Sequence, residues 1–338
     1  SQSLSHLVNI NMSDSCAESL TVQELCSLAG ESLDNIDLSY ASLKGGDSLR
    51  FQISELYPDK LGFTGEQVLT FAGAQEAIAA CYKALITKGD EVILCAPYYP
   101  SLYHTVLALG GIPKVIDLQF DNGWQYQVEH IDRLISDRTK LVVINSPHNP
   151  TGATLDIDQG KSLVKTLKAQ EIYLLLDDVA AFSNPSGKNK LGELLGYKNA
   201  VSISVMSKSF GLAGVRIGWA CSKNNELLHA MLTTKVSGSI CTSKVDEQLA
   251  IMAFKNKDAI LERNYQIIDN NKQLFDEFVK TNRLLSWHRP EEGILTTVKV
   301  SGVDCISSWC RDLAEKTGIL LMPASLFGLP GPYVRLGL

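Results

Sequence analysis

A lysine set among small polar residues, glycines and an arginine is the first feature of this sequence that could do chemistry. The stretch Ser204–Ala220 reads SVMSKSFGLAGVRIGWA, in which an apolar run ends just before Lys208 and Arg216 follows eight residues later. A lysine attacks a carbonyl carbon only when its amine is partly uncharged, a state that burial or a neighbouring cation favours. The stretch is therefore a candidate for covalent catalysis by Lys208, and the alternative is a surface lysine on a glycine-rich turn.

Four further motifs lie where apolar runs end, and they follow one another in a fixed order before Lys208. They read FAGAQEAIAA from residue 71, APYYPSLY from residue 96, NSPHNPTG from residue 145 and YLLLDDVAAF from residue 173. In the first motif, Gly73 precedes a helix whose free N–H groups and dipole can bind phosphate. In the last, Asp177 ends a buried run, where a carboxylate is costly without a partner. Each motif alone also has an ordinary explanation as a turn or a core cluster, so their weight comes from their order.

Together these segments resemble the pyridoxal-phosphate (PLP) site of class I/II aminotransferases, a family of PLP fold type I. The resemblance covers roughly residues 10–338, which is almost the whole chain. It implies that Lys208 holds the cofactor through a Schiff base and acts as the base at the substrate Cα. It also implies that Asp177 keeps the pyridine nitrogen protonated, which makes the cofactor ring an electron sink.

The resemblance assigns roles to further residues around the cofactor and the substrate. Five residues are implied to bind the cofactor phosphate: Gly73, Ala74, Gln75, Ser207 and Arg216. Tyr99 would stack on the ring, and Asn149 would bond the phenolic oxygen and help to bind the substrate. Arg335, in the final GPYVRLGL, would clamp the substrate carboxylate in a two-point contact. Tyr40 would reach the phosphate of a neighbouring subunit, which predicts a homodimer with shared active sites.

Two positions depart from the family pattern. Most members have a tyrosine three residues after the key aspartate, where this chain has Ala180, and many have a phosphate-binding serine where it has Val205. The first departure removes a hydroxyl that bonds the phenolic oxygen of the cofactor, which argues against ordinary transaminase tuning. The second removes one phosphate contact. Asp178, next to Asp177, is expected to point away from the site as a solvated or capping acid.

The fold alone does not select the reaction, because PLP sites of this type carry out transamination, elimination, cyclisation and decarboxylation. Asn11–Leu25 (NMSDSCAESLTVQEL) is similar to the N-terminal segment of a group that includes capreomycidine synthase, and the alternative is a flexible leader. With Ala180, this similarity favours elimination and cyclisation of a γ-hydroxyarginine-type substrate to a cyclic guanidino amino acid, such as capreomycidine or enduracididine, in natural-product biosynthesis. Asp14, Glu18 and Asp37 are candidates to bind the guanidinium group.

There are three alternatives to this function. An ordinary amino acid aminotransferase, which passes an amino group to a 2-oxo acid, is the main alternative. A PLP-binding transcription regulator is a remote alternative, because the chain has neither the room nor the charge for a DNA-binding module. A catalytically inactive homologue is equally remote, since the chain retains Lys208, Asp177, Asn149, Arg216 and Arg335.

The elements that must position these residues form an α/β pattern. From residue 68 to 222, short apolar runs alternate with amphipathic helical stretches, which predicts a doubly wound, mostly parallel seven-stranded sheet covered on both faces. Residues 223–285 are expected to be helical, with a long connecting helix over 257–280. The pattern after Pro290 predicts a smaller α+β domain. The expected division is an N-terminal segment that packs on the small domain, a large PLP-binding domain and a small C-terminal domain: 1–45, 46–285 and 286–338.

Composition limits the class of protein. The chain has 338 residues, of which 45% are apolar and 20% charged, with a net charge of −6 and no basic stripe. This predicts a large and a small domain without a nucleic-acid partner, and the family resemblance implies an amino acid substrate. No run approaches the ~20 apolar residues of a membrane span, and residues 1–10 lack the layout of a signal peptide. Eight cysteines without a C-x-x-C pair predict reduced, buried thiols, no metal site and a cytoplasmic protein.

The two ends of the sequence carry expectations of their own. The chain begins with Ser1 rather than methionine and stops directly after a predicted strand. We therefore expect a trimmed start, and we leave open whether a terminal helix is missing, disordered or cut.

Overall fold

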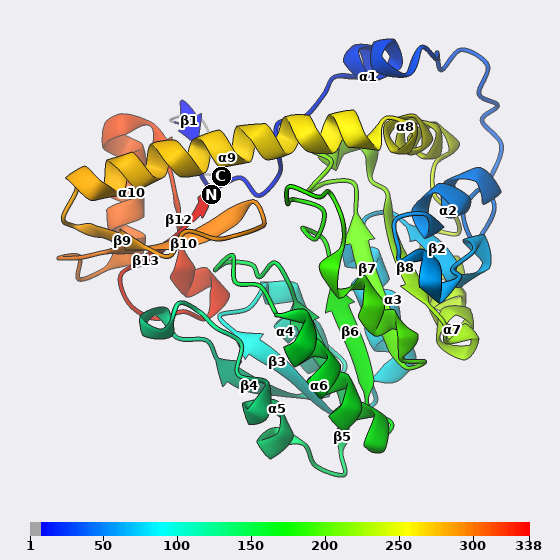
Figure 1. Cartoon of the computed structure of the whole chain (residues 1–338), viewed down its shortest axis with the longest axis horizontal. Helices are drawn as coiled ribbons and strands as arrows, with labels where there is room; N and C mark the ends of the chain where they lie inside the picture. Colours follow the sequence, from blue (N-terminus) through cyan, green and yellow to red (C-terminus); the bar gives the residue numbers. More distant parts are fainter. Residues whose placement is uncertain (1–7) are drawn as a thin grey trace.

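A seven-stranded sheet forms the centre of the computed structural model, which describes residues 8–338 (Figure 1). Its strand order is β2-β8-β7-β6-β5-β3-β4, and only β8 runs antiparallel to its neighbours. The strands are β2 (Val68–Phe71), β3 (Glu91–Ala96), β4 (Ile112–Asp117), β5 (Thr139–Asn145), β6 (Tyr173–Asp177), β7 (Ala200–Val205) and β8 (Gly218–Ser222). The predicted α/β fold with a mostly parallel sheet is confirmed. Residues 1–7 lie outside the described residues. They include the start of the predicted N-terminal segment and most of the residues in which we expect no signal peptide.

Both faces of this sheet are buried because successive strand residues point to opposite sides. On β6, for example, Leu174 and Leu176 belong to one apolar core and Leu175 belongs to the other. The first core is covered by α2 (Asp47–Ser54), α5 (Val128–Leu134), α6 (Ile157–Ala169) and α8 (Lys244–Lys255). The second is covered by α3 (Ala74–Leu85), α4 (Pro100–Ala108) and α7 (Asn225–Val236). This burial on two sides explains why the strands read as continuous apolar runs.

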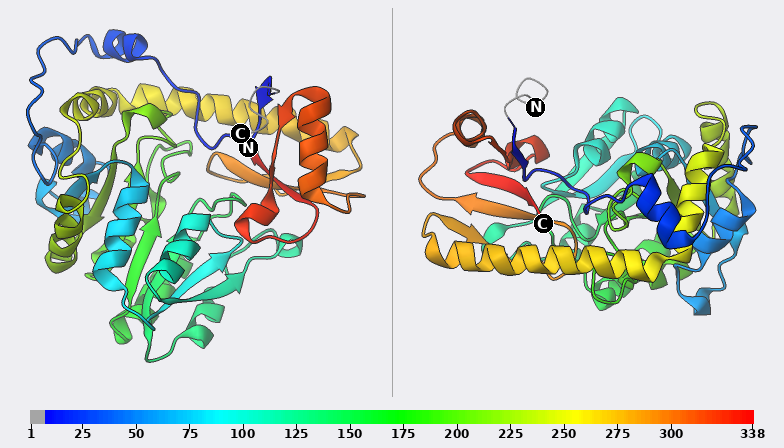
Figure 2. Two further views of the ribbon diagram at one scale, coloured as in Figure 1. Left: turned by 180° about the vertical axis from the view of Figure 1, so that it is seen from behind. Right: turned by 90° about the horizontal axis from the view of Figure 1, so that it is seen from above.

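A second, smaller layer is built on an antiparallel sheet. The 25-residue helix α9 (Lys257–Thr281) leads from the large sheet to this part of the chain, as Figure 2 shows from two directions. The small sheet has the order β12-β13-β10-β9, and its strands are β9 (Leu285–Trp287), β10 (Leu295–Val300), β12 (Met322–Pro323) and β13 (Tyr333–Gly337). Helix α10 (Ile306–Thr317) shares its core through Ile306 and Cys310. Strand β11 (Ile319–Leu320) does not join this sheet but pairs with a segment near the N-terminus.

The N-terminal residues connect the two parts. Strand β1 (Ile10–Asn11) pairs in parallel with β11 of the small part. The chain then crosses to the large part, where α1 (Val22–Ala29) begins at a capping box of Thr21 and Glu24 and packs against α8. Only part of residues 8–45 therefore contacts the small sheet. The division at residues 45 and 285 stays a prediction.

Other features of the described chain bear on the compositional expectations. Short 3₁₀ helices lie at Asp59–Leu61, Gly65–Gln67, Phe120–Asn122, Lys190–Gly196, Ala213–Val215 and Ala324–Phe327. The eight cysteines form no disulfide, but only four are buried, namely Cys81, Cys95, Cys221 and Cys310. Cys305 is exposed at the start of α10, so the prediction of buried thiols is wrong for this position. Among residues 8–338, no helix has both the length and the apolar character needed to cross a membrane.

Candidate active site

The candidate site lies at one edge of the large sheet, where the loops that follow β2, β3, β5, β6 and β7 come together. Parallel strands end at the same edge, so side chains that are distant in sequence meet there. The loops enclose a cavity of about 230 Å³. Eight of the predicted site residues line this cavity: Ala74, Gln75, Tyr99, Asn149, Asp177, Ser207, Lys208 and Arg216.

Asp177 ends β6 at the bottom of the cavity and is 2% exposed. One of its carboxylate oxygens, Oδ1, is buried without a hydrogen-bond partner in the described chain. Burial and the neighbouring charge of Asp178 raise the pKa of this carboxyl to about 7, although the Val179 N–H and Lys208 act against the shift. An unpartnered buried acid is costly unless a cation or a donor completes the site.

Asp178 differs from its expected role as a solvated or capping acid. It is 1% exposed, and its Oδ2 accepts hydrogen bonds from Ser202 Oγ at 2.6 Å and from Asn189 Nδ2 at 2.8 Å. The expectation is wrong because β7 and the loop before residue 190 cover this side chain with donors. Burial raises the pKa of Asp178 to about 6, and its charge adds to the raised pKa of Asp177.

The phosphate end of the cavity is built around Arg216. This residue has a positive φ of 51°, which costs a non-glycine residue about 1 kcal/mol. Its guanidinium donates to Ser207 Oγ at 3.3 Å and to the Ala72 carbonyl at 3.3 Å. Gly73 has a φ of 91°, and a Cβ atom there would overlap the Arg216 guanidinium. Helix α3 begins directly afterwards at Ala74, so its first N–H groups have no intrahelical partner.

The substrate end joins the two sheets of the molecule. Arg335 lies on β13 of the small sheet, and its Nη1 donates to Asn149 Oδ1 at 3.4 Å. Its Nη2 donates to the Ser13 carbonyl at 2.6 Å, while its Nε is buried without a partner in residues 8–338. Burial lowers the pKa of this guanidinium. Arg335 therefore keeps a donor unused beside Asn149.

Three residues that the sequence did not single out complete the site. Asn145 Oδ1 accepts from the Asn149 N–H at 2.7 Å, and Asn145 Nδ2 donates to the Asp177 carbonyl at 3.1 Å. Lys208 Nζ contacts Ser15 Oγ at 2.6 Å and Cys16 Sγ at 3.8 Å. Burial raises the pKa of the Cys16 thiol, which keeps it protonated at neutral pH. The position of Asn145 at a strand end was a usable signal, whereas nothing in the sequence pairs residue 15 with residue 208.

Tyr40 lies apart from the other predicted residues. Its side chain is 80% exposed, in a shallow hollow formed by residues 38–41 and 239–245. The two departures from the family pattern lie close to the site. Val205 lines the main cavity, and Ala180 lines a small adjoining cavity together with Ser15 and Lys208. Position 180 therefore offers no hydroxyl to the site.

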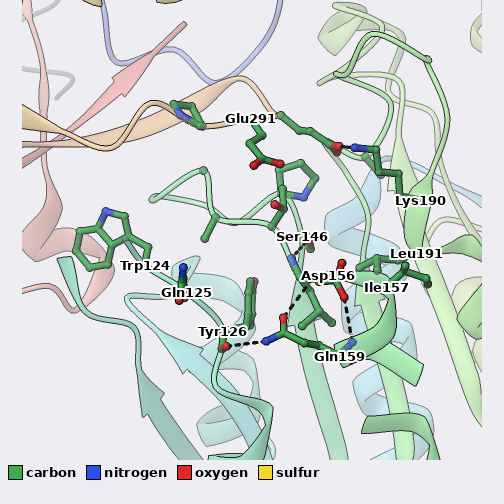
Figure 3. Close-up of a pocket in the computed structure, with 18 of the residues that line it drawn as sticks. Trp124, Gln125, Tyr126, Ser146, Asp156, Ile157, Gln159, Lys190, Leu191 and Glu291 are labelled. Carbon is green, nitrogen blue, oxygen red and sulfur yellow. Dashed lines mark hydrogen bonds and ion pairs between the residues drawn. The ribbon is translucent and has the colours of Figure 1, made fainter. Parts of the chain in front are cut away.

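A larger hollow of about 1030 Å³ borders the loop that carries Asn149 (Figure 3). Its wall includes Trp124, Asp156 and Glu291, and an ion pair between Lys190 and Glu292 adds to it. None of the predicted cofactor or substrate residues lines this hollow. The candidate cofactor and catalytic residues therefore lie at the smaller cavity.

Metal and histidine chemistry have little support in the described part of the chain. Residues 8–338 contain no group of three or more His, Cys, Asp or Glu side chains that could hold a metal ion. His148 lies beside the site, but burial lowers its pKa to about 3, so its ring is neutral at physiological pH. Lys208, the carboxyl group of Asp177, Tyr99 and Arg216 are the titratable side chains that line the cavity among residues 8–338.

Comparison with known proteins assigns the family. The model described as aminotransferase class I and II matches residues 8–338. The chain belongs to this family. Its members are PLP-dependent enzymes, so this chain is a PLP-dependent enzyme, and the expected PLP fold type I is confirmed by its solved relatives.

Individual relatives of this aminotransferase-family enzyme differ in their reactions. Aspartate aminotransferase of Sulfurisphaera tokodaii is 25% identical over 315 residues, which cover 89% of this chain and 77% of the relative. Capreomycidine synthase of Streptomyces vinaceus is 27% identical over 266 residues, covering 78% and 68%. A PLP-dependent aminotransferase from Streptococcus suis superposes with a TM-score of 0.91 at 29% identity, covering 98% and 89%. The PLP-dependent cyclase OrfR superposes with a TM-score of 0.86 at 25% identity, covering 97% and 87%.

The residues of the cavity fit PLP chemically. The unpartnered Asp177 Oδ1 matches a protonated ring nitrogen, which would supply the missing donor. Arg216, Ser207 and the start of α3 offer the donors that a phosphate needs. Lys208 lines the same cavity as both groups and carries the only amine that residues 8–338 place on its wall.

Proposed function

We propose that the enzyme removes the Cα proton and then a Cβ proton of a hydroxylated, guanidine-bearing amino acid, expels the γ-hydroxyl group as water and lets a guanidine nitrogen add to Cγ to close a ring. The adding nitrogen gives up a proton and protons return to Cα and Cβ, so the net change is the loss of one water molecule. A γ-hydroxyarginine is the specific substrate, and a cyclic guanidino amino acid is the product. The observation that carries this proposal is the absence of a hydroxyl at Ala180, together with the Asp14 carboxylate, which forms no ion pair within residues 8–338 and immediately precedes the residue that contacts Lys208. The likeness to capreomycidine synthase and to the cyclase OrfR supports it.

Binding and proton transfer divide among a few side chains. Arg335 would hold the substrate carboxylate through two N–H groups, in exchange for its present contact with the Ser13 carbonyl. The Lys208 amine takes the proton from Cα, and the Asp177 carboxylate holds the proton of the ring nitrogen. PLP, when bound, draws electrons away from Cα. Residues 13–18 contact Lys208 at two points, the amine through Ser15 and the backbone carbonyl through Ala17.

The contacts of the three acids proposed for the guanidinium are unequal. Glu18 pairs with Arg263 at 3.2 Å, and Asp37 pairs with Lys244 at 2.6 Å. The Asp14 carboxylate makes no ion pair with a basic side chain in residues 8–338. Its one hydrogen bond from a backbone N–H of these residues comes from Ser15, at 2.6 Å. Asp14 also immediately precedes the residue that contacts Lys208. A substrate cation therefore has most to gain from Asp14.

An ordinary aminotransferase is the second candidate. Lys208, Asp177, Asn149 and Arg216 line one cavity, and Arg335 contacts it through Asn149, which is the set that amino transfer requires. The aspartate aminotransferases among the relatives favour this reading. It differs from the first proposal in the fate of the substrate, because amino transfer leaves the side-chain hydroxyl in place.

Product analysis separates the two functions. Purified protein loaded with PLP and given γ-hydroxyarginine without a 2-oxo acid is expected to release a dehydrated, cyclised guanidino amino acid over many turnovers. Mass spectrometry detects the loss of water, and NMR identifies the ring. Arginine, which lacks the leaving hydroxyl, serves as the matched control and is expected to give no cyclic product. Formation of a 2-oxo acid with one equivalent of aminated cofactor, and nothing further, would contradict cyclisation and favour amino transfer.

We also propose that two copies of the chain share their active sites. Tyr40 is exposed in a hollow that contains none of the other predicted site residues, so it could serve a cofactor only in a second copy. Exposed Leu38 and Leu43 beside it add apolar surface to this face. Sedimentation equilibrium is expected to show a dimer at micromolar concentration. The Tyr40→Phe variant is expected to bind the cofactor more weakly while it remains a dimer. A monomer that retains full activity would overturn this arrangement.

A further inference from the structure

The N-terminal residues 12–18, here termed the strap, are held across the candidate site by contacts at both ends. At the small sheet, the Met12 carbonyl accepts from the Gly337 N–H at 2.9 Å. At the large part, the Ala17 N–H donates to the Lys208 carbonyl at 3.4 Å, and Arg263 donates to the Glu18 carbonyl at 2.9 Å. The strap therefore connects the two parts directly above Lys208.

Two glycines allow the strap to approach this closely. A Cβ atom at Gly337 would overlap the Asp14 carbonyl, and one at Gly211 would lie 2.9 Å from the Glu18 carbonyl. Gly211 also has a φ of 68°, which a residue with a side chain rarely adopts. Both positions thus favour glycine where the backbone of the strap passes. The position of the strap therefore depends on Gly211 and Gly337 in the parts of the chain that it contacts, and not on its own side chains alone.

Within the strap, Ser15 contacts the reacting amine. Its Oγ lies 2.6 Å from Lys208 Nζ, and its backbone N–H is bonded to the Asp14 carboxylate at 2.6 Å. Within residues 8–338, Ser15 supplies the one hydroxyl that is hydrogen-bonded to this amine. Cys16, at 3.8 Å, offers only a weak sulfur acceptor. A cavity of about 20 Å³ between Ser15, Ala180 and Lys208 has room for one water molecule.

We propose that Ser15 is a positioning residue that holds the Lys208 amine in place throughout proton transfer. An amine has N–H donors both when neutral and when charged, so Ser15 Oγ can accept one of them in either state. With that N–H fixed, the nitrogen lone pair keeps its direction toward the substrate Cα. The Cα–H bond breaks as the N–H bond of Lys208 forms, and the Ser15 proton stays in place. The proposal rests on the proposed role of Lys208 as the base, and it does not depend on which product follows.

The test compares Ser15→Ala with a conservative variant and a matched control. Ser15→Thr keeps the hydroxyl. The control Ser19→Ala changes the exposed residue after the strap, whose hydroxyl makes no hydrogen bond within residues 8–338. Exchange of the substrate Cα proton in deuterated water, followed by NMR, measures the step that Lys208 performs. We expect Ser15→Ala to slow exchange roughly 10- to 100-fold with little change in KM, because small displacements of a reacting group have effects of this size. Ser15→Thr is expected to recover most of the rate.

A second readout does not depend on turnover. The rate at which added PLP becomes fixed to residue 208 by borohydride, measured on the cofactor-free protein by mass spectrometry, reports on the placement of the amine itself. We expect this rate to fall in Ser15→Ala and to stay at the wild-type value in Ser19→Ala. Equal rates in Ser15→Ala and the wild type, or a Ser15→Thr protein as slow as Ser15→Ala, would overturn the proposal. Failure of Lys208→Ala to remove the covalent attachment would instead refute the function on which it rests.

Discussion

Replacing Lys208 with alanine is expected to remove the covalent attachment of PLP and to reduce Cα proton exchange by about 10⁴-fold. General-base catalysis by a positioned side chain accounts for roughly 10²- to 10⁴-fold, and here the same amine also holds the cofactor. No other amine from the described part of the chain lines the cavity. Borohydride treatment followed by peptide mass spectrometry measures the attachment, and NMR in deuterated water measures exchange.

The matched control for this prediction is Lys198→Ala. Lys198 is exposed in the turn before β7 and makes no ion pair in the described chain. Its removal is expected to leave both attachment and exchange unchanged. Persistence of a reducible attachment in Lys208→Ala, at any other lysine, would show that the covalent site has been assigned to the wrong residue.

The parts of the site that were predictable are those that strand ends position locally. A strand that is buried on both faces reads as a continuous apolar run, and its end is marked by the first polar residue, as at Asp177. Parallel strands end at one edge, and the resemblance of the ordered motifs to the class I/II aminotransferases implied that Lys208, Asp177 and Asn149 share one site. The structure brings these three together.

The parts that were not predictable depend on contacts between distant segments. Asp178 looks like a surface acid in sequence, and it is buried only because Ser202 and Asn189 supply donors from other elements. Ser15 lies 193 residues from Lys208, and its position follows from glycine-dependent packing of the strap. No periodicity or motif records such a contact. Helix α1 likewise packs on α8, which lies in a distant part of the sequence.

Asp177→Asn is expected to have the second large effect, with opposite signs on activity and on the stability of the cofactor-free protein. Asparagine keeps the shape of the side chain but loses the charge that a protonated ring nitrogen needs. Removing one partner of a buried charge pair costs about 2–5 kcal/mol, so we expect Cα proton exchange to fall roughly 100- to 1,000-fold. PLP binding is expected to weaken as well, and titration of the cofactor-free protein measures it.

The stability effect follows from the raised pKa of Asp177. In the cofactor-free protein this pKa is about 7, against 3.8 for the ordinary group. Between roughly pH 4 and pH 7, the folded protein therefore keeps a proton that the unfolded chain has lost. The free energy of unfolding falls as pH rises through this interval, because the buried carboxylate must ionise without a partner. Asparagine does not ionise, so the variant avoids this loss.

Urea unfolding of both cofactor-free proteins at pH 5 and pH 8 tests this linkage. We expect Asp177→Asn to gain stability relative to the wild type as pH rises, by an amount on the order of a few kcal/mol. Asp178 contributes to the raised pKa, so Asp178→Asn is expected to reduce the pH dependence of the wild-type carboxyl without abolishing it. A variant that is less stable than the wild type by the same amount at both pH values would show that Asp177 is ordinarily satisfied. If Asp177 destabilises the cofactor-free protein at high pH and strengthens PLP binding, then its buried position serves cofactor binding rather than folding.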